Sequence, residues 1–212
     1  MNCNRELRTR DFARGAALLA MLAASTSGCA FGTRNVDLTY PDAIARAQVT
    51  SQPKGTIAVS RFKDARTDEY ATGQQVGQVR NGYGMPTASV DAIQDPVLWV
   101  TDGLARGLML HGYKVEKVES PQSAGSLLVV DGSVVRIFAD SYVTINAEIV
   151  ADVSLIRDGA AVWNGQCQAS AGKVNWVGGA DEFHAVLVDA VEQFATECVG
   201  QIVGAIERAT AT

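Results

Sequence analysis

One alternating stretch, from Val143 to Leu155, constrains the fold more than any other part of the chain. Its odd-numbered positions are apolar: Val143, Ile145, Ala147, Ile149, Ala151, Val153 and Leu155. The residues between them are mostly polar. Successive side chains of a β-strand point to opposite faces, so this pattern predicts a strand with one covered face and one wet face. The chain is therefore expected to build a sheet with another layer packed on one side.

Neighbouring segments are predicted to extend this sheet. Arg157-Asp158-Gly159 has the composition of a hairpin turn, and residues 161–171 return from it as another strand. Three further strands are predicted at 56–62, 113–118 and 127–138. The alternation of the last one is blurred at Asp131-Gly132, which indicates a β-bulge there.

Two helices are predicted to form the second layer. Asp95 and Pro96 suit the N-cap and first position of a helix, and Gly112 suits its left-handed end. A longer helix is predicted from about Asp181 to Arg208, with an apolar stripe spaced by three and four residues. Two helices on one face of a mostly antiparallel sheet make a two-layer α+β sandwich.

Residues 63–94 form a long connection without a strong helical pattern. Gln74 to Arg80 alternates loosely and runs into Asn81-Gly82, which predicts a short hairpin or an extended flap. Turns explain Gly73, Gly77, Gly82 and Gly84 better than a phosphate-binding loop, which would need Lys followed by Ser or Thr. Because such long connections are usually functional or disordered, we expect the flap to contact a partner.

The first 28 residues have the composition of a secretory signal peptide. Four arginines precede the apolar run Ala16–Ala24, and small residues lead to Gly28. Cys29 follows at once, and this junction resembles the lipobox of bacterial lipoproteins, in which the cysteine is acylated. A plain signal peptide, cut nearby to release a soluble periplasmic protein, is the alternative.

This organisation predicts three parts: a signal peptide at 1–28, a lipidated N-terminus and tether at 29–54, and one domain at 55–209. Ala30 occupies the place where an inner-membrane retention signal would have Asp. We therefore expect the protein on the periplasmic face of the outer membrane.

Two of the four cysteines, Cys167 and Cys198, fall in the predicted domain. Cys167 shares strand parity with Trp163 and Ala169, and Cys198 lies on the apolar stripe of the second helix. Both should point into the interface between the layers. In an oxidising compartment they could form a disulfide; the alternative is two buried thiols that act as small apolar residues.

Composition and motifs argue against several functions. The net charge of −5 offers no basic surface for nucleic acid. His111 and His184, the two histidines, belong to no recognisable metal-binding or hydrolase motif. We expect neither catalysis nor a metal or other cofactor.

Partner-binding candidates are Arg66, Arg80 and Tyr83 in the flap, and Trp176 in the loop before the last helix. Aromatic and arginine side chains are enriched at binding hot spots. The alternatives are a solvated mixed-charge loop around Arg66 and a tryptophan folded back onto its own core.

Several strings resemble the YajG-like bacterial lipoproteins: Asp64-Ala65-Arg66, Val76-Gly77, Arg80 to Gly84, and His111-Gly112-Tyr113. The resemblance covers roughly residues 36–209. It implies a membrane-anchored lipoprotein of unassigned biochemical role, usually at the outer membrane. We expect a binding or scaffold module that contacts an envelope protein. The alternative is an accessory subunit of a transporter for lipid or glycan, with an open apolar groove between sheet and helices.

Overall fold

The computed structural model describes residues 32–48, 52–68, 71–174 and 178–210. The predicted signal peptide and Cys29 lie outside these ranges. The elements are, in chain order, β1 (Arg34–Val36), α2 (Asp42–Ala45), β2 (Thr56–Ser60), β3 (Lys63–Asp64), β4 (Gln75–Arg80), β5 (Pro86–Ala92), α3 (Pro96–Leu110), β6 (Lys114–Val118), the 3-10 helix η2 (Pro121–Ala124), β7 (Leu128–Ser141), β8 (Thr144–Arg157), β9 (Ala160–Val174) and α4 (Ala180–Thr210).

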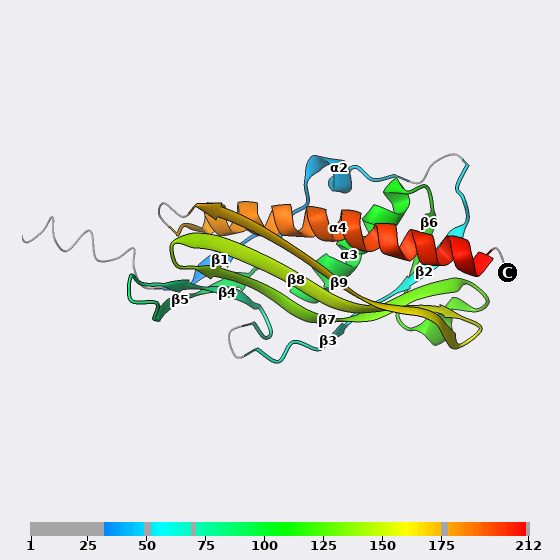
Figure 1. The fold of residues 1–212 in the computed structure, drawn as a ribbon, viewed down its shortest axis with the longest axis horizontal. Coiled ribbons are helices and arrows are strands. Elements are labelled where there is room, and N and C mark those ends of the chain that lie inside the picture. The colour runs from blue at the N-terminus through cyan, green and yellow to red at the C-terminus, as the bar shows by residue number, and fades with distance from the viewer. Residues whose placement is uncertain (1–31, 49–51, 69–70, 175–177, 211–212) are drawn as a thin grey trace, which may run out of the picture. The chain divides into compact units, whose positions relative to one another are not determined.

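The long strand β7 organises the sheet. One of its edges pairs with β8 in an antiparallel register that runs from Val129–Ile156 to Ser141–Ile145, and β8 pairs in turn with β9. The other edge pairs with β2, β3 and β4 one after another, all in parallel. The two long hairpins make the nine-stranded sheet mostly antiparallel (Figure 1).

The alternation in β8 places one face in the core, as predicted. Ile145, Ile149 and Val153 are buried, whereas Asn146 and Asp152 are exposed. The long helix α4 lies against β8 and β9, and α3 packs beside it (Figure 1). Their buried side chains join those of the sheet in one hydrophobic core. The α+β class with helices packed against the sheet is confirmed.

Local signals set the ends of α3. The Asp95 carboxylate accepts hydrogen bonds from the amides of Val97 and Leu98, and Gly112 adopts a positive φ of 90° after the helix. Within α3, a Cβ added to Gly107 would lie 2.7 Å from the Ala195 carbonyl oxygen of α4. The absence of a side chain therefore lets the two helices approach closely. No helix among the described residues is long and apolar enough to span a membrane.

The bulge in β7 lies further along the strand than predicted. The register with β8 shifts between Val134 and Arg136, not at Asp131-Gly132. Gly132 has another role, because a Cβ there would lie 2.5 Å from the Asp152 carbonyl oxygen of β8 and 2.9 Å from the Phe62 ring. The glycine that blurred the alternation thus makes room for the neighbouring strand and for an aromatic side chain.

The structure differs from the tether predicted over residues 29–54. Residues 34–36 form strand β1, which pairs in parallel with β5. Val36, Leu38 and Ile44 are buried in this segment. Its short strand and single helical turn lack a sustained periodicity, so the sequence pattern did not reveal that they pack onto the domain.

The segment 63–94 contains the predicted hairpin, but that hairpin is part of the sheet. Strands β4 and β5 pair with each other, and β4 also pairs with β7. Gly77 is not a turn residue, because it lies inside strand β4 and pairs with Ala139 of β7. A Cβ on it would collide with the backbone of Ala139. Gly73, Gly82 and Gly84 do lie in turns or bends, where two of them have positive φ.

Candidate functional site

Arg66 is an internal residue and not a partner-binding one. Its side chain is only 1% exposed. The guanidinium donates to both carboxylate oxygens of Asp64, at 2.9 and 2.7 Å, and to the carbonyl oxygen of Gly73 at 2.7 Å. The hydrogen bond from Arg66 holds the pKa of Asp64 below its ordinary value of 3.8. Arg66 therefore fastens the connection between β3 and β4, and the surface role predicted for it is wrong.

Arg80 is half-buried and also makes structural contacts. Its Nε lies 2.8 and 2.9 Å from the two carboxylate oxygens of Asp140 on β7. Its guanidinium also donates to the Gly84 carbonyl oxygen at 3.2 Å. The arginine thus links the β4–β5 turn to the neighbouring strand.

Tyr83 is the predicted partner residue that lies fully on the surface. It is 89% exposed in the β4–β5 turn, beside Met85, which is 56% exposed. The β7–β8 turn adds Tyr142 and Val143, which are 50% and 67% exposed. Tyr142 donates a hydrogen bond to the Gly82 carbonyl oxygen at 3.0 Å, so the two turns touch. We call Tyr83, Met85, Tyr142 and Val143 the tip surface. Trp176 lies outside the described residues.

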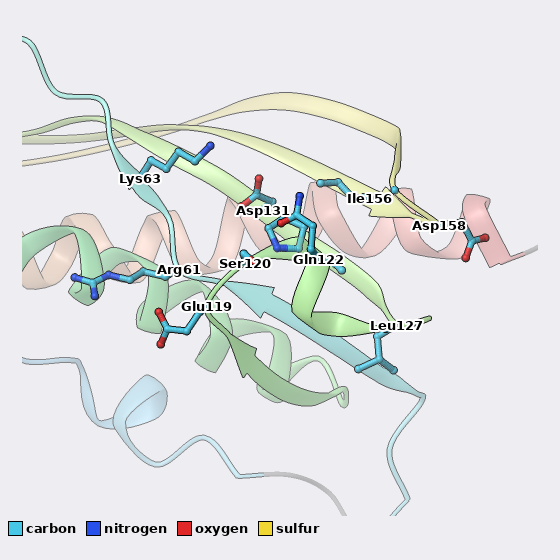
Figure 2. A pocket seen from close by; sticks show the side chains of 13 residues that line it. Arg61, Lys63, Glu119, Ser120, Gln122, Leu127, Asp131, Ile156 and Asp158 are labelled. Atoms are coloured by element: carbon cyan, nitrogen blue, oxygen red, sulfur yellow. The ribbon is translucent and has the colours of Figure 1, made fainter.

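A hollow of about 510 Å³ lies near the other end of β7. Its lining residues, shown in Figure 2, come from four parts of the chain: the β2–β3 connection, the loop after β6, the start of β7 and the β8–β9 turn. We call this the end pocket. Its lining residues are Arg61, Lys63, Glu119, Ser120, Pro121, Gln122, Gly125, Leu127, Val129, Asp131, Ile156, Asp158 and Gly159.

The end pocket carries charges of both signs. Arg61 donates to Asp95 at 3.1 Å, and the Ser60 hydroxyl donates to the Asp131 carboxylate. Among the residues that the structure describes, Lys63 and Glu119 form no ion pair. Exposed charges of both signs around a hollow suit a polar partner with a complementary charge pattern.

The lining residues of the end pocket include the Asp131 carboxylate and the Ser120 hydroxyl but no histidine. His184 lies elsewhere, with its Nε2 2.7 Å from the Thr39 hydroxyl oxygen, and His111 caps the end of α3. In the described part of the chain, no group of three or more His, Cys, Asp or Glu side chains could hold a metal ion. The polar side chains that line the pocket can form hydrogen bonds and charge pairs with a bound molecule.

The sequence patterns did not point to the end pocket. Only Lys63 fell within the predicted partner segment. The other residues come from turns and strand ends that are distant in sequence. The polar residues from Glu119 to Gln122 were the one local sign of a surface site. The residues opposite them in the hollow are brought there by the order of the strands, which the sequence pattern does not show.

Cys167 on β9 and Cys198 on α4 form a disulfide with a Cα–Cα distance of 5.3 Å. It closes a loop with a sequence separation of 31 residues and crosses the interface between sheet and helix. Buried side chains fill the rest of this interface. Among the described residues, the interface around this bridge is a packed hydrophobic core.

Comparison with known proteins supports the fold. No family model and no curated protein matches the sequence. A protein of the DUF330 family from Xanthomonas campestris has a similar fold, with a TM-score of 0.56 and 15% identity over 85% of this chain and 98% of its own. An uncharacterised protein matches with a TM-score of 0.50 and 11% identity over 80% and 99% of the two chains.

A lipoprotein from Neisseria meningitidis, GNA1162, gives a lower TM-score of 0.35 at 14% identity, over 71% of this chain and 99% of its own. A TM-score at this level carries no argument about function. The DUF330 similarity establishes the fold alone.

Proposed function

We propose that this protein is a non-catalytic lipoprotein of the bacterial outer membrane, anchored through an acylated Cys29 with its domain on the periplasmic side. The domain acts as a binding or scaffold module for another envelope protein. Its resemblance to the YajG-like lipoproteins over residues 36–209 is part of this proposal.

The disulfide between Cys167 and Cys198 is the observation that carries the proposal. Disulfides form and persist in oxidising compartments such as the bacterial periplasm and are rare in the cytosol. A buried disulfide in a domain that follows a signal-type N-terminus indicates export. It accounts for two of the four cysteines, and Cys29 stands where a lipobox places the acylated residue.

The end pocket is the surface that we assign to the partner. Protein interfaces place complementary charges opposite each other, and this arrangement contributes to specificity and to the rate of association. Lys63 and Glu119 are both exposed on the pocket's rim. A polypeptide segment with its own mixed charges fits this lining better than an apolar ligand would.

Fatty-acid labelling in cells tests the anchor. Cys29→Ser should abolish incorporation of a palmitate analogue and move the protein to the soluble periplasmic fraction. Cys3→Ser is the matched control, because this cysteine lies in the predicted signal peptide; that variant should stay labelled and membrane-bound. Unchanged labelling or membrane association of Cys29→Ser would contradict the proposal.

Site-specific photocrosslinking tests the partner role. A photoreactive residue at Gln122, in the end pocket, should give one discrete adduct with an envelope protein in intact cells. The same residue at Gln193, on the exposed face of α4, is the control and should give no such adduct. Charge reversal at Lys63 should weaken the adduct. Equal adducts from both positions, or none from Gln122, would argue against a partner at this pocket.

A further inference from the structure

The tip surface is apolar although it lies on two turns, where polar residues are the norm. Tyr83, Met85, Tyr142 and Val143 are each at least half exposed and come from turns that touch each other. Val174, which is 55% exposed, pairs with Thr144 just beyond the β7–β8 turn. Exposed apolar clusters of this kind mark surfaces that contact another molecule or a membrane.

Hydrogen bonds hold the β4–β5 turn in a defined shape. The Asn81 side-chain oxygen accepts from the amides of Tyr83 and Met85, at 2.9 and 3.1 Å. Gly84 supplies the positive φ of 80° that the turn needs, and Arg80 binds its carbonyl oxygen. The constrained backbone of this turn therefore holds the side chains of Tyr83 and Met85 toward the outside of the protein.

Strand β1 begins on the side of the sheet that faces the tip surface. Strand β1 runs parallel to β5, with Arg34 opposite Val90, and the hydroxyl oxygens of Thr33 and Ser89 are 3.1 Å apart. Because β5 starts at Pro86, directly after Met85, both strands run away from the tip surface. The chain thus enters β1 from the tip side.

Covalent geometry limits how far Cys29 can be from this entry point. Thr33 is four positions after Cys29 in the chain. Since an extended chain spans about 3.5 Å per residue, Cys29 lies within roughly 14 Å of Thr33 in any conformation. From Ser89 back to Met85 the strand covers a similar length, about 13 Å at about 3.3 Å per residue. A lipid on Cys29 would hold this end of the domain against a bilayer.

We propose that the tip surface rests in the interfacial layer of the membrane that carries the Cys29 lipid; this inference rests on the proposed function. Tyrosine suits this layer because its ring is apolar and its hydroxyl remains hydrated. Met85 and Val143 add apolar area that can enter the boundary between headgroups and acyl chains. Strand β7 then directs the end pocket away from the bilayer, about 40 Å further out at about 3.3 Å per residue.

A dye on an introduced cysteine tests the inference in the full lipidated protein. In that protein Cys29 carries the lipid and Cys167 is bonded to Cys198, so a new cysteine is the free thiol of the mature chain. We would label Met85→Cys with a polarity-sensitive fluorophore. Val143→Cys is a second tip position, and Asp158→Cys at the end pocket is the control. The protein is reconstituted into phosphatidylethanolamine–phosphatidylglycerol vesicles, with or without nitroxide-bearing lipid.

The expected result is a blue shift of emission at positions 85 and 143 on vesicles, and loss of intensity with the nitroxide lipid. Position 158 should show neither change. Vesicle-bound protein without these changes at the tip would overturn the inference and leave the proposed function standing. If the blue shift appeared only after an envelope protein extract was added, the tip surface would bind a protein, and the inference would also be overturned. Failure of the protein to stay on vesicles would overturn the proposed function itself.

Discussion

The guanidinium of Arg66 donates two hydrogen bonds to the carboxylate of Asp64, at 2.9 and 2.7 Å, although only one residue lies between them in the chain. The arginine side chain is buried, whereas that of Asp64 is 43% exposed. This pair, with the bond from Arg66 to Gly73, fixes the connection that leads from β3 to β4.

Loss of Arg66 should therefore reduce stability and not merely change the surface. Arg66→Ala leaves the Gly73 carbonyl without its buried donor, which should lower the free energy of unfolding by about 2–3 kcal/mol. Arg46→Ala is the matched control, because Arg46 pairs with Asp42 on the surface, and its effect should stay within about 0.5 kcal/mol. Denaturant unfolding measures both. Similar values for the two variants would contradict the internal role of Arg66.

The Asp64 pair should also make stability depend on pH. Because the hydrogen bond from Arg66 lowers the pKa of Asp64 below 3.8, the folded protein binds fewer protons than the unfolded chain in that range. The stability that the Asp64–Arg66 pair contributes is fully present above the pKa that Asp64 has in the unfolded chain. It is lost as the pH falls through the lower pKa that Asp64 has in the folded protein. In unfolding experiments from pH 6 to pH 3, the wild type should lose stability more steeply than Asp64→Asn. Parallel curves would show that the pair does not titrate as described.

Gly77 should tolerate no side chain, because a Cβ there would meet the backbone oxygen of Ala139 on the neighbouring strand. Gly77→Ala should lower the free energy of unfolding by about 1–3 kcal/mol through overpacking. Gly82→Ala is the control, since nothing lies within 4 Å of its added Cβ and its φ is not in the left-handed region. Thermal unfolding of the two variants should differ clearly. Equal melting temperatures would refute the close strand contact.

The disulfide can be tested by mass and by stability. The non-reduced protein, unfolded in an alkylating reagent, should show no added mass at Cys167 or Cys198. Because the bridge closes a loop with a sequence separation of 31, its loss in the Cys167→Ala, Cys198→Ala double variant should cost about 3–4 kcal/mol in the chain-entropy model. Alkylation of both thiols without prior reduction would rule out the bridge.

Much of the fold could be predicted because its signals are local. The alternation in β8, the N-cap at Asp95 and the apolar stripe of α4 each depend on neighbours a few residues away. The spacing of apolar residues within each element determines which of its faces is apolar. The apolar faces of the sheet and of the helices are buried against each other, which gives the two layers. The segment at 34–48 was missed because a three-residue strand and one helical turn are too short to show a period.

The candidate sites depended on contacts between distant residues. The sequence alone predicted an α+β domain, and it predicted that Cys167 and Cys198 each face the interface between the two layers. Only the tertiary structure decided that Arg66 is buried, that Tyr142 bonds to the turn that carries Tyr83, and that Lys63 lines a pocket near the other end of β7. The physical reason is strand order: β7 pairs with β2, β3 and β4 in succession. This pairing brings together turns that are far apart in the chain. The spacing of apolar residues within one segment does not show which strands will pair.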